Sequence, residues 1–238
     1  MNTEEKKDCL KQLAKKRQKD RYRYSKFKNL CDYHDGYYEG GYVSPYSISA
    51  HNVDSKIMVI LKDWTSDNVL KAPIDESRKN IGHDIKRSTN KNLKRYIKNY
   101  FNRNLRDIYV TNLFPFVKKG NPNSSIDRTA LYYAAKEYAI PQIECINPCL
   151  VIALGSATFN VLRKTCDNNY SWSSGKNLIK SNNQHFKYTY KSKNPGKIFH
   201  SEIWFQFHTS QQAQNPRGPA KIDEDWTKMK KWFEENCL

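Results

Sequence analysis

The sequence lacks cysteines at the spacing that builds metal sites. Its six cysteines are scattered and none forms a C-x-x-C pair: Cys9, Cys31, Cys145, Cys149, Cys166 and Cys237. This spacing argues against zinc and iron–sulfur sites, and we expect neither a metal nor a cofactor. A chain of 238 residues can bury a core without disulfides, so we expect reduced thiols in an intracellular compartment.

Long apolar runs are also missing. The first twenty residues, MNTEEKKDCLKQLAKKRQKD, contain no stretch typical of a signal peptide, and no later run has the length of a membrane span. We therefore expect a soluble, cytoplasmic protein, monomeric and without a membrane partner.

Acidic residues are few relative to basic ones. Lys and Arg number 41 against 24 Asp and Glu, a formal net charge of +17, which favours a polyanionic partner such as nucleic acid. The alternative is that surplus lysine only keeps the protein soluble. Two segments, 86–106 and 175–197, carry lysines or arginines with aromatic or amide residues and no acid. That mixture suits contact with a nucleic-acid backbone.

The composition changes once along the chain. Residues 1–43 predict a basic helix over 3–27 and a loop rich in Gly and Tyr, and residues 44–238 predict the main domain. The basic helix could lie along DNA, or it could pack on the main domain through its few apolar residues.

Four short apolar runs in the main domain have the length and composition of buried strands: 56–61, 107–112, 149–154 and 202–207. Helical spacing lies between them at 92–101 and at 129–143, where Pro141 interrupts the second pattern. Alternating strands and helices predict an α/β fold, a three-layer α/β/α sandwich around a mainly parallel four-stranded sheet.

Polar side chains stand where three of these strands end. Asp63 follows the first strand, Asn112 ends the second and His208 follows the fourth. Ligands of open parallel sheets bind beyond the carboxyl ends of the strands. Each residue alone could cap a turn, but the three together indicate one shared crevice.

The segments around these residues resemble the motifs of the uracil-DNA glycosylase superfamily, in the order of that family and over about residues 44–218. They are VILKDW, VTNLFPF, LVIALGSATFNVL and FHTSQQAQNPRG. Two departures matter. Thr65 stands where the best-known branch has a tyrosine that crowds the methyl group of thymine, and Gln211 and Gln212 replace the apolar wedge that fills the vacated base stack.

The resemblance implies roles for the residues at the strand ends. Asp63 would orient water and stabilise the cationic sugar, and His208 would donate a hydrogen bond to the departing base. Asn112 would read the base edge, and Trp64 or Phe114 would stack on the flipped ring, although both could be core aromatics. Candidate DNA ligands are polar or basic: Ser88, Lys94, Arg95, Lys98, Ser210, Gln212 and Arg217.

The function expected from the resemblance is that of a DNA glycosylase, which flips a damaged or modified pyrimidine out of DNA and hydrolyses its N-glycosidic bond. The base would be uracil or a modified cytosine, including hypermodified bases of phage DNA, in base-excision repair or antiviral defence on single- or double-stranded DNA. Lys62 is the only lysine expected beside Asp63, so we expect a monofunctional enzyme that leaves an abasic site. Two alternatives are a non-catalytic nucleic-acid-binding module and a small-nucleotide hydrolase or transferase.

Overall fold

The centre of the protein is a five-stranded sheet. A computed structural model describes residues 1–20, 27–191 and 197–238, and its sheet has the strand order β3-β2-β5-β7-β6. The strands are β2 (Ile57–Asp63), β3 (Tyr109–Phe114), β5 (Leu150–Leu154), β6 (His185–Lys191) and β7 (Ile198–Gln206). The first four in spatial order are parallel, and β6 is antiparallel to β7. The four predicted strands are confirmed, but the count of four is wrong because β6 adds an edge strand.

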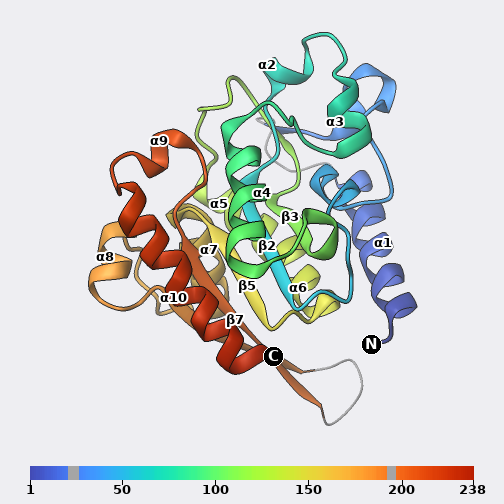
Figure 1. Cartoon of the computed structure of the whole chain (residues 1–238). Helices are drawn as coiled ribbons and strands as arrows, with labels where there is room; N and C mark the ends of the chain where they lie inside the picture. The colour runs from blue at the N-terminus through green and yellow to red at the C-terminus, as the bar shows by residue number, and fades with distance from the viewer. Residues whose placement is uncertain (21–26, 192–196) are drawn as a thin grey trace.

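Helices cover both faces of this sheet (Figure 1). On one face, α4 and α10 pack their apolar side chains against the sheet, and on the other face α1, α5, α6 and α7 do so. The helices are α1 (Thr3–Lys19), α2 (Asp67–Leu70), α3 (Glu76–Ile81), α4 (Ser88–Phe101), α5 (Arg128–Ala134), α6 (Ile140–Ile146), α7 (Ser156–Cys166), α8 (Gly175–Lys180), α9 (Gln211–Gln214) and α10 (Pro219–Cys237). In the described ranges, no helix combines the length and the apolarity needed to cross a bilayer.

A π-helical turn precedes Pro141 in the second predicted helix, and the chain remains helical after the proline. The residues Ala135–Ala139 form a π-helical turn between α5 and α6, and Pro141 then lies in the first turn of α6. Proline is tolerated there because its missing N–H is not required in a first helical turn. The helical segment therefore continues past the proline, where the sequence pattern suggested an interruption.

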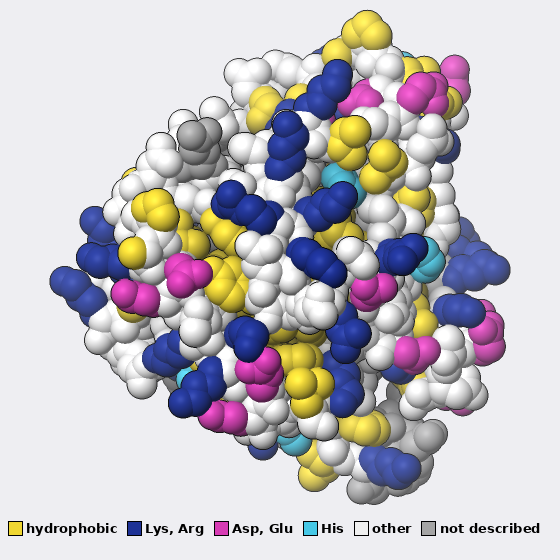
Figure 2. Space-filling model, in the orientation of Figure 1, with side chains coloured by type: hydrophobic (Ala, Val, Ile, Leu, Met, Phe, Trp, Pro, Cys, Tyr) yellow, Lys and Arg dark blue, Asp and Glu magenta, His cyan; other side chains and the backbone are white. Residues whose placement is uncertain are grey.

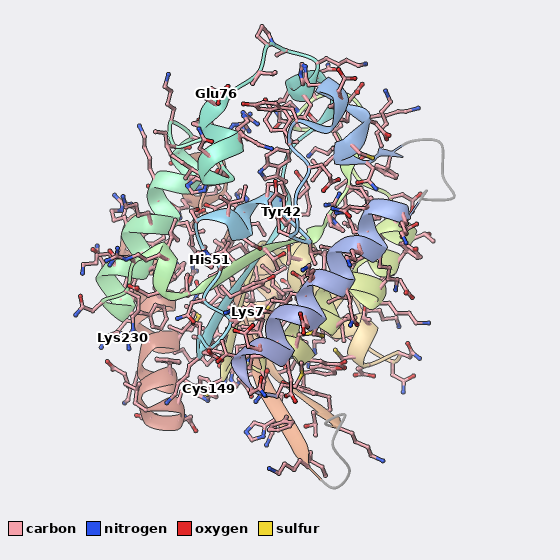
Figure 3. All side chains as sticks on the ribbon, turned by 90° about the vertical axis from the view of Figure 1, so that its right-hand side faces the viewer. Lys7, Tyr42, His51, Glu76, Cys149 and Lys230 are labelled. Carbon is pink, nitrogen blue, oxygen red and sulfur yellow. A yellow bond between two sulfur atoms is a disulfide. The ribbon has the colours of Figure 1, made fainter. Side chains whose placement is uncertain are left out.

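The N-terminal helix α1 packs on the main domain. Leu10 and Ala14 are buried in the core on the α6 side of the sheet, and Figure 3 shows α1, which carries Lys7, lying along that side of the molecule. Its Arg17 is fully buried and forms a salt bridge with Glu39. Three further ion pairs join basic side chains of α1 to acids. Much of the charge of α1 is thus neutralised within the protein, and residues 21–26 of the predicted basic helix lie outside the described residues.

The cysteines depart from the sequence-based expectation of reduced thiols. Disulfides join Cys9 of α1 to Cys145 of α6 and Cys149 to Cys237. Cys149 precedes β5 and lies beside α10, the helix that carries Lys230 (Figure 3). The expectation was wrong because each bond joins residues that only the tertiary fold brings together, 136 and 88 positions apart in the sequence.

A two-residue ribbon completes the fold beside β2. Strand β1 (Phe27–Lys28) pairs antiparallel with β4 (Val117–Lys118). Lys118 also forms an isolated bridge with Ser66, just beyond the end of β2. This short ribbon fixes the backbone of Lys118 next to Asp63.

Candidate active site

A large cavity opens at the carboxyl ends of the parallel strands. It encloses about 1060 Å³, and its walls contain all three residues that the strand ends predicted, Asp63, Asn112 and His208. Cavities that bind drug-sized ligands span about 300–1000 Å³, so this one is large enough for a nucleotide base with substituents. The sequence-based prediction that these three side chains share one crevice is confirmed.

The carboxylate of Asp63 lies in a buried ion pair with Lys118. The ammonium of Lys118 donates to both oxygens of Asp63, at 3.0 and 3.1 Å, and to the carbonyl oxygen of Pro122 at 2.6 Å. The side chain of Lys118 is 1% exposed and that of Asp63 is 13% exposed. Burial lowers the pKa of the Lys118 ammonium, and the negative charge of Asp63 opposes this shift. The ammonium thus lies between the carboxylate and the carbonyl oxygen of Pro122, and it contacts both oxygens of Asp63.

The position of Lys118 shows that the expectation of a single lysine beside Asp63 was wrong. Lys62 was the only lysine expected beside Asp63, and its ammonium lies 3.4 Å from the carboxylate. Lys118, which lies far along the chain in the run Lys118-Lys119, makes the closer contact. Sequence reasoning missed it because two adjacent lysines followed by Gly120 look like a solvent-exposed turn.

His208 presents a neutral imidazole to the cavity. The backbone N–H of Ser210 donates to Nδ1 of His208 at 3.2 Å, so the proton of the neutral ring is carried by Nε2. Burial lowers the pKa of His208, and nearby Asp63 opposes this shift. The ring is therefore neutral at pH 7 and can donate one hydrogen bond through Nε2.

A glycine whose backbone conformation disfavours other residues lies beside His208. Gly155, between β5 and α7, has a φ of +92°, a conformation that residues with a side chain rarely adopt. A Cβ atom placed there would lie 3.8 Å from the Cβ of His208. The first turn of α7 can thus form part of the cavity wall directly beside the histidine.

Asn112 reaches the same cavity from β3. It pairs with Leu61, two positions before Asp63, so Asn112 and Asp63 project from the same face of the sheet. The hydroxyl of Ser44 donates to Oδ1 of Asn112 at 2.5 Å. Among the described residues, neither Nδ2 of Asn112 nor Oγ1 of the cavity-lining Thr158 has a hydrogen-bond partner, although both atoms are buried. Both residues belong to the cavity wall.

The predicted stacking aromatics have different surroundings. Trp64 lines the cavity, but its indole N–H donates to the carbonyl oxygen of Gly82 at 2.8 Å and its ring meets Tyr38 edge-on. Phe114 is fully buried against Phe27 and does not belong to the described cavity wall. Its place in the core argues against stacking on a ligand.

Other aromatic side chains do line the cavity, and no sequence pattern indicated them. Tyr46 stacks on His83, with the ring centroids 4.5 Å apart and the planes 10° from parallel. Phe205 and Phe207 also contribute to the wall. From the sequence, Tyr46 was only the last residue of a predicted loop. Its burial depends on contacts with residues distant in the sequence, such as His83.

The predicted DNA ligands fall into three groups. Ser88, Ser210 and Gln212 line the cavity. Lys94, Arg95 and Lys98 are exposed on α4 outside the cavity wall, and Figure 2 shows Lys and Arg side chains gathered on the face over this helix. Arg217 forms a two-point ion pair with Asp225, at 3.0 and 2.9 Å. Its guanidinium therefore already has a protein partner.

The charge of α4 is less neutralised than that of α1. Lys91, Lys94, Arg95 and Lys98 form no ion pair with an acid in the described part of the chain. No acidic residue occupies the first turn of α4, and Ser88 and Thr89 at its start line the cavity. The helix N-terminus, with its free N–H groups, adds positive potential there. The most suitable surface for a polyanion thus runs from the cavity along α4.

The second basic segment, 175–197, begins at the cavity, where Gly175 lines the wall, and its hairpin then leads away from it. Strands β6 and β7 form a hairpin at the opposite end of the sheet from α2 and α9 (Figure 1). Strand β7 has nine residues, about 30 Å in an extended chain, between the hairpin end and the cavity. Residues 192–196 of this segment lie outside the described residues. Only the end of the hairpin at Lys191 and Ile198 is therefore far from the cavity.

Among the described residues, no group of three or more His, Cys, Asp or Glu side chains is arranged to hold a metal ion. The polar groups of the cavity wall include the carboxylate of Asp63, the imidazole of His208, the amide of Asn112 and the ammonium of Lys118. No protein-family model and no curated protein matches this chain.

Proposed function

We propose that the chain is a DNA glycosylase that hydrolyses the N-glycosidic bond of a flipped pyrimidine, as its resemblance to the uracil-DNA glycosylase superfamily implies. The observation that carries this proposal is the convergence of Asp63, Asn112 and His208 in one cavity at the strand ends. The three side chains come from three separate parts of the sequence, and they combine a negative charge, a base-reading amide and a neutral donor.

The reaction needs groups of opposite character on the two sides of one bond. As the bond breaks, the sugar becomes positively charged and the departing base becomes negatively charged. The Asp63 carboxylate, held by Lys118, would stabilise the sugar and orient a water molecule. The Nε2–H of His208 would donate to an oxygen of the base as that oxygen gains charge. Water then supplies the hydroxyl that stays on the sugar, and the base leaves with a proton.

The charged face of α4 supports a role on DNA. Extruding a base from a duplex costs a few kcal/mol, and phosphate contacts must offset that cost. The exposed basic side chains of α4, together with Ser88 in the cavity wall, would bind the phosphates that flank a flipped nucleotide.

The size of the cavity supports substrates larger than uracil. Thr65 lines the wall and accepts a hydrogen bond from Arg78, in the place where the resembled branch has a tyrosine. A threonine leaves more room than a tyrosine, so both uracil and a cytosine with a C5 substituent are candidate substrates. Removal of uracil would serve base-excision repair, and removal of a modified cytosine would serve defence against modified phage DNA.

A panel of oligonucleotides tests the proposal. Single- and double-stranded DNAs containing uracil, 5-methylcytosine, 5-hydroxymethylcytosine or glycosylated cytosine are incubated with the protein, and released bases are detected by mass spectrometry. We expect release of a base and an abasic site from at least one substrate, and a loss of several orders of magnitude in Asp63→Asn with DNA binding intact. Wild-type rates in Asp63→Asn would contradict the proposed mechanism.

One observation favours a second candidate, a nucleic-acid-binding module without turnover. Both oxygens of Asp63 accept hydrogen bonds from Lys118, which offsets the charge that the reaction would use. The same assay separates the candidates, because a binding module retains modified DNA without releasing a base.

A further inference from the structure

Positive charge is in excess on the cavity wall. Burial lowers the pKa of His83 and His208, which both line the cavity, so both are neutral at pH 7. The described part of the wall contains four basic and two acidic groups, which gives it a net charge of +2. These charged residues are Lys62, Asp63, Arg78, Asp84, Arg87 and Lys118.

Lys62 carries part of this excess. The carboxylate of Asp63 already accepts two hydrogen bonds from the buried ammonium of Lys118, at 3.0 and 3.1 Å. The ammonium of Lys62 lies farther away, at 3.4 Å, on a side chain that is 36% exposed. Because Lys118 alone neutralises the carboxylate, the charge of Lys62 is available to a ligand in the cavity.

Arg87 provides a second accessible cation. The carboxylate of Asp84 accepts from Nη2 of the buried Arg78 at 3.2 Å, and Nε of Arg78 donates to Asp75. Arg87 donates to the same Asp84 carboxylate only through Nε, at 3.4 Å, from a side chain that is 44% exposed. Its two Nη groups have no partner among the described residues. Its guanidinium can therefore still bind an oxyanion.

These basic groups lie close enough to repel one another. Burial is the main cause of the lowered pKa of Lys118, and the positive charges of Lys62 and Arg87 lower it further. Gathering like charges is unfavourable in the free protein, and an anion bound beside them offsets the repulsion. A neutral pyrimidine ring would not have this effect.

We propose that Lys62 and Arg87 bind phosphate groups of the nucleotide that occupies the cavity. This inference rests on the proposed function in one respect, that the ligand is a nucleotide. Ammonium and guanidinium groups bind phosphate oxygens through charge-assisted hydrogen bonds. The basic side chains of α4 would contact DNA along its backbone at any position, whereas Lys62 and Arg87 would contact only the phosphates beside the nucleotide in the cavity.

Neutralising single phosphates tests this contact. The probe is an oligonucleotide, single-stranded or in a duplex, with one tetrahydrofuran residue, an abasic-site analogue that has no base to release. An uncharged methylphosphonate replaces the phosphate on its 5′ side or on its 3′ side, and the Kd is measured for each. We expect each replacement to weaken binding by the wild-type protein about tenfold, because a hydrogen bond between charged groups is lost.

Two variants assign the contact to these residues. Lys62→Met and Arg87→Met should each weaken binding about tenfold, and in each variant one of the two methylphosphonates should add no further loss, because the phosphate charge that it removes has no partner. Both variants should stay folded, since each acid retains its buried basic partner. Lys86→Met is the matched control, because Lys86 is the exposed neighbour of Arg87 and does not belong to the described cavity wall. It should retain the full effect of both methylphosphonates.

A competition experiment distinguishes phosphates of DNA from those of a free nucleotide. Deoxycytidine and deoxyuridine 5′-monophosphates are added to the bound probe. Binding that resists an excess of both supports DNA as the source of the phosphate. Displacement that is lost in Lys62→Met and Arg87→Met supports the same phosphate contact and assigns it to a free nucleotide, which refutes the glycosylase.

The remaining outcomes separate this inference from the glycosylase proposal. Unchanged binding in Lys62→Met and Arg87→Met, methylphosphonate effects that persist in both variants or disappear in Lys86→Met, or wild-type protein that binds no probe overturns the phosphate contact. Coupled losses without release of any base from modified DNA support the contact and refute glycosylase activity. Release of a base together with unchanged binding in both variants refutes the phosphate contact alone.

Discussion

Replacing Lys118 by methionine should destabilise the protein through Asp63. The substitution keeps the length of the buried side chain and removes the ammonium that donates to both carboxylate oxygens and to the carbonyl of Pro122. Removing one partner of a buried ion pair costs about 3–5 kcal/mol. Lys62, which is 36% exposed and 3.4 Å away, can move closer to Asp63, so we expect the lower end, about 3 kcal/mol.

A double-mutant cycle shows whether this cost passes through the carboxylate. In Asp63→Asn the charge that Lys118 neutralises is already absent, so adding Lys118→Met should cost less, with a coupling of about 2 kcal/mol. The free energy of unfolding is measured in urea for the wild type, both single variants and the double variant. Lys119→Met is the control, because Lys119 is exposed and its loss should change stability by less than about 0.5 kcal/mol.

The same variant tests the orientation of the carboxylate in the reaction. If Lys118 aligns Asp63, Lys118→Met should slow single-turnover base release by roughly 10²-fold, the effect of a small misplacement of a reacting group. A coupling near zero in the unfolding cycle would refute the role of Lys118 as the partner that holds Asp63. Equal single-turnover rates would refute its role in alignment.

The remaining predictions concern the amine, the charges, the imidazole and the disulfides. Borohydride should trap no covalent adduct with DNA, because the ion pair with Asp63 favours the protonated form of Lys118, which is not a nucleophile; a trapped adduct would show a free amine nucleophile. Replacing Lys94, Arg95 and Lys98 together with Glu should weaken binding to all DNA sequences and flatten its salt dependence in a filter-binding titration. Three charge reversals on α1 are the control and should change DNA affinity little. Equal losses of affinity in the two triple variants would contradict DNA binding along α4. Because burial lowers the pKa of His208 below 6.5, the ring stays neutral as the pH falls to that value, and the rate of base release should decline only at lower pH; a decline centred above 6.5 in a pH–rate profile would contradict the neutral donor. Reducing the disulfides, which span 136 and 88 residues, should lower the Tm, since each stabilises by about 4–5 kcal/mol in the chain-entropy model; an unchanged Tm with reductant would show that the bonds do not form.

The strands and the three central site residues were predictable because their signals are local. Each buried strand is a continuous apolar run, and parallel strands end at the same edge, so Asp63, Asn112 and His208 had to lie close together. Strand β6, with the residues HFKYTYK, was missed because it lies in the lysine-rich segment 175–197, which was interpreted as a nucleic-acid contact surface. That composition indicated a surface segment rather than a strand.

The partners of the site residues were not predictable in this way. Ser44 and Lys118 contact Asn112 and Asp63 across 68 and 55 positions of sequence, and neither residue lies in a distinctive local pattern. Phe114 was assigned to the ligand because it follows Asn112, but β1 brings Phe27 against its ring, with the centroids 4.8 Å apart. Contacts of this kind follow from the packing of whole elements, which no local sequence pattern encodes.

The order of the strands has a consequence for how the protein folds. Strand β5 pairs with β2 on one side and with β7 on the other, although α7, α8 and β6 separate β5 from β7 in the chain. A nascent chain that has formed β5 but not β7 exposes the edge of an apolar strand, which other chains can pair with. The same intermediate lacks His208. Partly folded chains should therefore be prone to aggregation and chemically inactive, so that protection by chaperones before β7 inserts would decide the yield of competent protein.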